Sequence, residues 1–553
     1  MPKYRATKVV LLALIAFLAT AAHAQTFSVL YNFGSFPGDA LVPVQPGTIA
    51  QGRDGNFYST SGRGGNYNMG SAFKLTPAGQ IMVLYGFGGT FINNEGSFPS
   101  SGLTPGSDGS FYGAAYTGGA YNVGTVFKIT PSGTLNQLYD FTGGTDGASP
   151  LAAPIEGSDG NLYGTAAAGG ANHGIIYKIT AAGKFSLLHT FAGSDGGFAQ
   201  SQLIQGTDGN FYGTTSGGGA NGNLGTIFKI TPAGKLTTLF SFDSVHGTSP
   251  DASLIQGKNG NFYGSARFGG LYGHGVIFMI TPTGRLSVLH DFCPVAGCAD
   301  GSSPDTALVQ GSDGNFYGVA SDGANSYGTL FKMTPAGAFT VLHTFDPTSG
   351  WTPVTLTQPT NGLLYGAASA GGTGTGCGSS SGCGTFFNLN LGLPPYATFL
   401  PQASSGKVGS SVGIYGQGFN SASSVLFGSV SASFTVSTDG YLTATVPSGA
   451  ATSPITVTTA TATLKTPRNF RVLPQITSFT PSSGPVGTNV QISGNTLIHA
   501  NKVTFGGVAA TAFTVNSDTQ VTATVPTGAK TGKIIIFTSA GSATSPATFT
   551  MTP

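Results

Sequence analysis

The feature of this sequence that most limits its fold is a repeat of about 51 residues. The hexapeptide Asp-Gly-Asn-Phe-Tyr-Gly at residues 208–213 recurs in altered form along the chain. Successive copies begin 54, 51, 49, 51, 54 and 48 residues apart. The copies begin at Asp54, Asp108, Asp159, Asp208, Asn259, Asp313 and Asn361. A period of this length is typical of a propeller blade or a large β repeat.

Each repeat contains four short apolar segments separated by turn residues. An Asp-Gly turn follows the first segment, a glycine-rich loop follows the second, and a Pro-Ala-Gly turn follows the third. In the fourth repeat the segments predict strands at residues 201–205, 210–215, 226–231 and 235–242. Regularly spaced hairpins of this size predict four-stranded blades around an axis. We therefore expect an all-β fold with a seven-bladed β-propeller.

The two ends of the repeat array predict how the ring closes. The seventh repeat stops after its third strand, at residues 384–390, and runs into Leu393-Pro394. The segment TFSVLYNF at residues 26–33 matches the missing fourth strand. An N-terminal strand that completes the seventh blade would remove the two exposed sheet edges of an open array. An open solenoid remains the alternative.

The recurring aromatic residues favour a structural interpretation. One tyrosine position in the second strand and one aromatic position in the third strand are kept in all seven repeats, for example at Tyr212 and Phe228. A position that is aromatic in every blade is better explained by packing between blades than by seven identical ligand platforms. The Asp-Gly pairs are equally structural, because Asp caps its own turn and Gly adopts positive φ.

The repeat also resembles a known family. The segments GTDGNFYGTTSGGG and GTIFKITPAG, at residues 206–219 and 225–234, resemble the tandem repeat named for Gloeobacter and Verrucomicrobia. This GloVer repeat occurs in exported bacterial proteins with varied C-terminal modules. The resemblance implies a surface or secreted propeller-like protein and transfers no catalytic residue.

After Pro394-Pro395 the composition shifts to Ser, Thr, Val and Ala, and two copies of about eighty residues follow. Alternating strands with regular turns predict two small β-sandwiches. The segment ITSFTPSSGPVGTNVQISG at residues 476–494 resembles the opening of IPT/TIG immunoglobulin-like domains. That resemblance implies spacer or adhesive modules. The expected domains are a signal peptide (1–24), a seven-bladed propeller (25–393) and two sandwiches (394–473 and 474–553).

The first residues predict export. Lys3, Arg5 and Lys8 precede an apolar run from Val9 to Ala22, and Ala22-His23-Ala24 predicts cleavage before Gln25. A membrane anchor is the alternative, but the run is shorter than the ~20 residues that span a bilayer. The mature protein is therefore expected to be secreted or on the outer cell surface, without a membrane span.

Charge and cysteine content limit the classes of partner and bound group that the chain is expected to have. Only 8% of residues are charged and the net charge is +2, so nucleic acid is not an expected partner. Cys293 lies close to Cys298, and Cys377 close to Cys383, which predicts two short-range disulfides in an exported chain. A zinc site is the alternative, although neither spacing is a CxxC knuckle. No metal and no cofactor are expected.

Catalytic motifs are sparse. The chain has two glutamates, and Glu156 stands where other repeats have glutamine, so only Glu95 is unexplained. His189, His290 and His343 share a fourth-strand position that is Tyr or Phe elsewhere, which favours packing over base catalysis. The sequence favours a non-enzymatic binding or adhesion protein with an extracellular polysaccharide or cell-surface protein as partner. A secreted carbohydrate-active enzyme and a structural scaffold remain open.

The long connections predict the binding surface. Turns between strands one and two and between strands three and four are short and uniform. The connections on the other side are long and variable, and large polar aromatics on variable loops suit recognition. The predicted ligand-binding residues at the tips of the glycine-rich loops are Tyr67, Tyr121, His173, Asn221, Tyr272, His274 and Tyr327. Glycine spacing and loop solubility are the alternative explanation.

Overall fold

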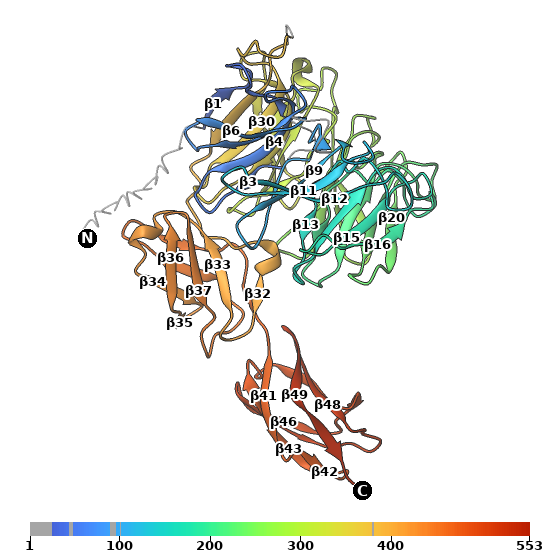
Figure 1. Cartoon of the computed structure of the whole chain (residues 1–553), viewed down its shortest axis with the longest axis vertical. Coiled ribbons are helices and arrows are strands. Elements are labelled where there is room, and N and C mark those ends of the chain that lie inside the picture. Colours follow the sequence, from blue (N-terminus) through green and yellow to red (C-terminus); the bar gives the residue numbers. More distant parts are fainter. Residues whose placement is uncertain (1–24, 44–47, 89–95, 100, 379–380) are drawn as a thin grey trace, which may run out of the picture.

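The computed structural model describes residues 25–43, 48–88, 96–99, 101–378 and 381–553 (Figure 1). The predicted signal peptide at residues 1–24 lies outside the described residues. The described chain is built mainly of antiparallel sheets, so the all-β prediction is confirmed. Its helices are the short 3-10 turns η1 (Ala324–Ser326), η2 (Pro401–Ala403) and η3 (Phe419–Ser421).

Each of the seven repeats forms a sheet whose strands run antiparallel in chain order. The first strands are β3 (Ala50–Gln51), β8 (Thr104–Pro105), β13 (Ile155–Glu156), β17 (Ile204–Gln205), β21 (Ile255–Gln256), β25 (Val309–Gln310) and β29 (Trp351–Thr357). The second strands are β4 (Phe57–Gly64), β9 (Phe111–Ala115), β14 (Leu162–Ala166), β18 (Phe211–Thr215), β22 (Phe262–Ala266), β26 (Phe316–Ala320) and β30 (Leu364–Ala370).

The third and fourth strands of the repeats are equally regular. The third strands are β5 (Ser71–Leu75), β11 (Thr125–Ile129), β15 (Ile175–Ile179), β19 (Thr226–Ile230), β23 (Val276–Ile280), β27 (Thr329–Met333) and β31 (Thr385–Asn390). The fourth strands are β6 (Ile81–Gly86), β12 (Leu135–Asp140), β16 (Phe185–Thr190), β20 (Leu236–Ser241), β24 (Leu286–Asp291) and β28 (Phe339–Thr344). Two further pairings are β2 (Ala40–Pro43) on β4, and β7 (Gly96–Ser97) with β10 (Thr117–Gly118).

The N-terminal strand completes the seventh sheet. β1 (Thr26–Asn32) pairs antiparallel with β31, from Thr26 opposite Asn390 to Asn32 opposite Thr385. The order of this sheet is β1-β31-β30-β29. The predicted pairing of the two ends of the repeat array is therefore observed.

The second strands lie at the centre of the packing. All five residues of β18 are buried, because neighbouring sheets cover both faces. The motif glycine Gly213 has the ring of Phe228 above it: a Cβ at this position would lie 2.7 Å from Cζ of that ring. The glycine that ends the hexapeptide in every repeat but the first, which has Ser59, therefore makes room for the third-strand aromatic.

Recurring aromatics join most of the sheets to the next. The ring of Tyr212 stacks on Phe262 of the next repeat, with centroids 4.0 Å apart. Tyr58 and Phe111, Tyr163 and Phe211, and Tyr263 and Phe316 repeat this contact. Tyr365 of the seventh repeat meets Phe57 of the first, with centroids 4.6 Å apart. The aromatics therefore pack between sheets, as predicted, and the contact also joins the last repeat to the first.

A second set of contacts follows the same path. The first-strand Gln256 accepts a hydrogen bond from the Thr207 N–H in the preceding repeat's Asp-Gly turn, at 3.0 Å. Glu156 does the same with Ser107, at 2.6 Å, so its predicted structural role is confirmed. Gln51 accepts from Thr360 N–H of the seventh repeat, at 3.2 Å. The second repeat has Pro105 instead of glutamine, and there Arg53 Nη2 donates to the Ser107 carbonyl.

Two sandwiches follow the repeats (Figure 1, orange and red). The strands of the first are β32 (Ser405–Gly406), β33 (Ser411–Tyr415), β34 (Ser424–Phe427), β35 (Val430–Ser431), β36 (Phe434–Thr438), β37 (Tyr441–Thr445), β38 (Ile455–Thr458), β39 (Thr463–Lys465) and β40 (Arg471–Val472). The strands of the second are β41 (Gln475–Thr480), β42 (Ser483–Gly484), β43 (Asn489–Asn495), β44 (Ala500–Phe505), β45 (Val508–Ala509), β46 (Phe513–Ser517), β47 (Gln520–Thr524), β48 (Gly532–Thr538) and β49 (Gly541–Met551).

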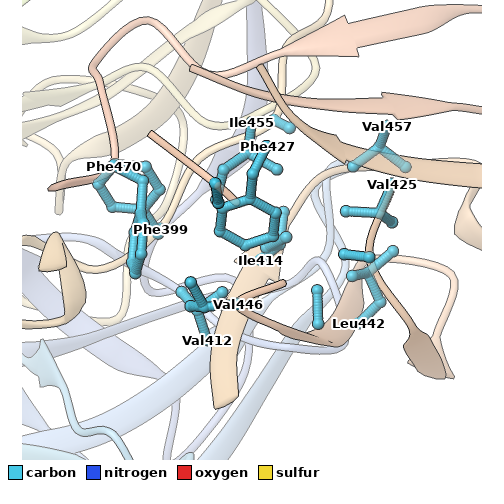
Figure 2. Close-up of a cluster of buried hydrophobic side chains, with 14 of the residues drawn as sticks. Phe399, Val412, Ile414, Val425, Phe427, Leu442, Val446, Ile455, Val457 and Phe470 are labelled. Carbon is cyan, nitrogen blue, oxygen red and sulfur yellow. The ribbon is translucent and has the colours of Figure 1, made fainter. Parts of the chain in front are cut away.

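Each sandwich has its own apolar core. In the first, Figure 2 shows Phe399, Phe427 and Phe470 together, and the Phe427 and Phe470 ring centroids are 5.4 Å apart. The alternating strands β33 and β37 supply the opposite wall through buried Ile414 and Leu442. The second sandwich repeats this plan with Ile492 and Phe549 among its buried residues.

Candidate functional site

The strand order gives the repeat region two unlike sides. In a sheet of four consecutive antiparallel strands, the first and third turns lie at one end. The middle connection and the link to the next sheet lie at the other end. We call these the short-turn side and the long-connection side.

Side-chain hydrogen bonds brace the turns of the short-turn side. In the fourth repeat, Asp208 Oδ1 accepts the Asn210 N–H at 3.1 Å and Oδ2 accepts the Tyr212 hydroxyl at 2.9 Å. Burial by itself raises the pKa of Asp208. The hydrogen bonds from Asn210 and Tyr212 outweigh burial, so this pKa lies below its ordinary value. The Asp of the motif therefore caps its own turn, as predicted.

The first sandwich contacts the short-turn side of the repeats. Arg471 Nη1 donates to the Thr207 carbonyl at 2.6 Å, and Arg468 Nη2 donates to the Gln256 carbonyl at 3.1 Å. Further contacts join Arg53 to the Tyr441 ring, Thr360 to the Gly416 carbonyl and Gln402 to the Pro105 carbonyl. These contacts reach the first, second, fourth, fifth and seventh repeats, so the sandwich lies across the short-turn side.

The long-connection side carries the exposed aromatics. Every strongly exposed Phe or Tyr side chain of the described residues lies in a connection of this side. These residues are Phe36, Tyr67, Phe98, Tyr116, Tyr121, Phe198, Phe268 and Tyr272. Water-exposed aromatic rings gathered on one side of a molecule mark an interaction surface.

The predicted site residues divide into two groups. Tyr67, Tyr121 and Tyr272 are 52%, 60% and 44% exposed, and Asn221 and His274 are also exposed. Asn221 uses its Nδ2 to donate to the Ser241 carbonyl at 2.9 Å.

The other two predicted residues, His173 and Tyr327, are half-buried. Tyr327 packs on Trp351 with centroids 5.2 Å apart, and His173 meets Phe198 edge-on. Both therefore help to support the connections on which the exposed residues stand.

A groove brings together residues of the fifth and sixth repeats. It has a volume of about 600 Å³. Its lining comprises Phe268, Gly273, His274, Gly297, Cys298, Ser302, Ser303, Asp322, Gly323, Asn325 and Ser326. Of the predicted residues only His274 lines it. The sequence analysis missed Phe268, Asp322 and Asn325.

A sequence signal for part of the missed aromatic surface exists. Phe98 and Phe198 stand at a repeat position that is Ser149, Ser249 or Ser303 elsewhere, and all five have φ between 51° and 56°. An aromatic side chain in place of serine at a loop position with positive φ indicates a role in binding rather than in packing. Phe268 gives no such signal, because its neighbours across the groove come from another repeat.

Both predicted disulfides are present. Cys293 bonds to Cys298 and Cys377 to Cys383. In the described part of the chain, the group with metal-ligand geometry is His274 with Cys293 and Cys298, whose ligand atoms lie within 4.8 Å of one another. Sulfurs in a disulfide are not thiolates, so this trio does not favour zinc.

The fourth-strand histidines pack as predicted, and two of them also hold loops. His189 bonds Asp195 at 2.8 Å and His290 bonds Asp300 at 2.9 Å, as Tyr31 and Tyr139 bond Asp39 and Asp146 in other repeats. The same aspartates accept backbone N–H groups, for example Cys293 N–H on Asp300. This shared arrangement favours a structural role for the histidines.

Two carboxyl groups of the long-connection side have an unusual environment. Asp305 is 3% exposed, and its Oδ2 lies 3.8 Å from Arg267 Nε. Burial raises the pKa of Asp251 to about 6, partly offset by the charge of Arg267. Sequence reasoning missed this pair, although the recurring Ser-Pro-Asp at 249–251 and 303–305 could have revealed it.

None of the helices in the described part of the chain has the length and apolar character needed to cross a membrane.

Comparisons with known proteins match families over most of the chain. The family model described as Gloeobacter/Verrucomicrobia repeat matches residues 16–206 and 152–387. The IPT/TIG domain model matches residues 397–472 and 474–551. No curated protein matches the sequence.

Similar solved structures are distant. A surface glycan-binding protein from Prevotella bryantii is 21% identical over 26% of this chain and 38% of its own, with a TM-score of 0.20. A protein of a xyloglucan utilisation locus in Bacteroides uniformis is 22% identical over 28% of this chain and 50% of its own, with a TM-score of 0.15. A fungal alcohol oxidase is 13% identical over 94% of this chain and 100% of its own, with a TM-score of 0.38. This chain spans half or less of the first two, and with TM-scores below 0.5 none of the three bears on its ligand.

Proposed function

We propose, on the premise that this chain belongs to the Gloeobacter/Verrucomicrobia repeat family, that it is an exported, non-enzymatic protein that binds polysaccharide. The repeats would form a closed seven-bladed propeller (25–393), and the long-connection side would hold the ligand. The two TIG domains (394–473 and 474–553) would act as spacer or adhesive modules.

The contacts between repeats support ring closure. Strand β1 supplies the fourth strand of the last sheet, which leaves neither end of the array with a missing strand. The tyrosine stack and the glutamine bridge that join successive repeats also join the seventh to the first. An open array would leave both contact sets unpaired at its ends.

The observation that carries the binding function is the unequal exposure of the two sides. Exposed aromatic rings lie on the long-connection side, whereas the first TIG domain covers the short-turn side. Aromatic rings present broad apolar faces to sugar C–H groups, and tyrosine adds a hydroxyl. An uncharged ligand suits a chain in which only 8% of residues are charged.

Export is supported by the two disulfides. Disulfides persist in oxidising compartments and are rare in the cytosol. The proposed site of action is therefore outside the cell, with the signal peptide removed before Gln25.

Binding of the full mature chain to immobilised polysaccharides tests this function. Joint replacement of Tyr67, Tyr121, Tyr272 and Tyr327 with alanine should weaken binding at least tenfold. Changes in the short turns at Ala78, Ser132 and Ala233 should leave binding intact. The proposed side is wrong if the turn variant loses binding while folded and the tyrosine variant keeps it.

A second candidate function rests on Asp251 and Asp305. Glycoside hydrolases typically use two carboxyl groups, one of which has a raised pKa and acts as the general acid. The intervening Arg267 also fits a structural ion pair. Release of reducing ends from a bound polysaccharide, abolished by Asp251→Asn, would establish the enzyme; binding without release would leave the binding function alone.

A further inference from the structure

We propose that the groove between the fifth and sixth repeats is a sugar-binding subsite for an uncharged residue of a polysaccharide. This proposal rests on the proposed function and deepens it by naming the place and the ligand chemistry. Three connections build the groove: 267–275 and 321–328 follow the second strands β22 and β26, and 292–308 links the two repeats.

Phe268 offers the apolar face. Its side chain is 44% exposed and lines the groove, and Arg267 Cζ lies 5.1 Å from the ring centroid. The backbone is fixed on Thr248 by two hydrogen bonds, at 2.7 and 3.1 Å. With the backbone fixed, only the two side-chain torsions of the ring remain to be restrained when a pyranose stacks on it.

The polar side chains of the groove are available to a ligand. In the described part of the chain, the side chains of His274, Asn325 and Ser326 make no hydrogen bond to other protein groups. Asp322 Oδ1 accepts the Gly323 N–H at 2.8 Å, which orients the carboxylate. Imidazole, amide, hydroxyl and carboxylate groups together can donate to and accept from sugar hydroxyls.

The disulfide fixes one wall. The link at 292–308 is longer than its counterpart at 242–254, and the added segment is closed by Cys293–Cys298. Asp300 anchors the base of this segment, because it accepts from Cys293 N–H at 3.1 Å and bonds His290. On the other side, Ser302 and Asp322 pair through backbone hydrogen bonds of 2.9 and 3.2 Å.

Charge selects an uncharged ligand. Asp322 lines the groove, and no Lys or Arg side chain is among its lining residues. Arg267 lies outside the lining, with its Nε 3.8 Å from Asp305 Oδ2, so the carboxylate of Asp322 is the charged lining group that a uronate would meet. Neutral hexose chains avoid this repulsion.

The test uses the full mature chain and affinity electrophoresis in gels with soluble starch, laminarin, galactomannan or dextran, and with alginate as the charged probe. Phe268→Ala and Asn325→Gly should each weaken binding to a neutral probe about tenfold, equal to ~1.4 kcal/mol. Glycine keeps the positive φ of Asn325, which is 70°. Leu187→Ala, at an equally exposed apolar side chain on strand β16 away from the long connections, should change affinity less than about twofold.

The outcomes separate the two proposals. If a neutral probe binds and Phe268→Ala matches wild type, the groove is not the subsite, whereas the binding function stands. Preference for alginate would overturn the neutral-sugar assignment. Failure of every polysaccharide to bind would overturn the proposed function together with the groove. Both substituted side chains are exposed, so native circular dichroism is expected for each variant.

Discussion

At the residue scale, the motif tyrosines make a bond that can be tested singly. The Tyr212 hydroxyl crosses the turn to Asp208 at 2.9 Å, and the rest of its side chain is buried. Tyr212→Phe keeps the packing and removes this bond. We expect the free energy of unfolding to fall by about 1 kcal/mol in urea titrations.

Tyr177 is the matched control. Its hydroxyl is buried without a hydrogen-bond partner among the described residues, and burial raises its pKa above the usual range for tyrosine. Other repeats have Phe at this position, for example Phe228. Tyr177→Phe should therefore leave stability unchanged or raise it by up to about 1 kcal/mol. Equal losses in both variants would refute the role of the turn bond.

His343 predicts a dependence of stability on pH. It stacks on Phe27 of the closing strand with centroids 3.7 Å apart, and its Nε2 is buried without a partner in the described chain. Burial lowers the pKa of His343, and only the Asp346 charge opposes this. Near and below the unfolded-state pKa of about 6.5, the unfolded chain binds more protons than the folded chain. The free energy of unfolding therefore decreases as the pH is lowered.

His343→Phe should remove that share of the pH dependence. Phe occupies the equivalent position at Phe240, so the packing is preserved. We expect the wild-type and variant stability profiles to run parallel above pH 7 and to diverge below pH 6.5, with the wild type losing more. Profiles that stay parallel down to pH 5 would contradict this assignment.

At the element scale, we expect β1 to stabilise the whole repeat array. Phe33, which follows β1, is fully buried and packs on Phe73 of the first repeat. Phe33→Ala should cost about 3–5 kcal/mol of unfolding free energy. Met82→Ala, at an exposed site on β6, should change stability by no more than about 0.5 kcal/mol.

Deletion of Gln25–Phe33 extends this test to the whole strand. Calorimetry should show all repeats unfolding together at a lower temperature. A separate low-temperature transition confined to the seventh repeat, or unchanged melting, would contradict closure by β1.

The repeat period made the strands predictable, and the errors are local. The fourth repeat has strands at 211–215, 226–230 and 236–241, close to expectation, but β17 is only Ile204–Gln205 where 201–205 was predicted. The Ser201 hydroxyl bonds the Thr214 carbonyl at 3.2 Å and so replaces the strand pairing there. A side-chain bond of this kind leaves no mark in the hydrophobic pattern.

At the scale of the whole molecule, three arginines set the position of the first TIG domain, and the sequence did not reveal it. Arg53 occupies a position that is Ser or Thr in most other repeats, and a single substitution of this kind does not by itself indicate a contact. Arg468 and Arg471 bond repeats more than two hundred residues away. The groove was missed for the same reason, because Phe268 and Asn325 meet only through packing of separate repeats. Periodicity predicts contacts within a repeat and between equivalent positions, not such unique ones.

Replacing both Arg468 and Arg471 with alanine should release the TIG domains from the repeats. Each lost bond removes about 1–2 kcal/mol from this contact. Arg471 also donates to the Ala540 carbonyl of the second TIG domain at 2.9 Å. Small-angle scattering should show a larger radius of gyration for R468A/R471A. The radius should not change in Arg285→Ala, which removes one arginine from an exposed turn. An unchanged radius in both would refute the docking role.

Hydrogen–deuterium exchange of the full mature chain, with and without saturating polysaccharide, tests the central claim most directly. We expect slower exchange in the long connections at 116–124, 267–275 and 321–328, because a ligand there excludes water and restrains the loops. Exchange in the Asp-Gly turns and in both TIG domains should stay unchanged. Protection confined to the short turns or the TIG domains, with the long connections unaffected, would show that the ligand binds elsewhere.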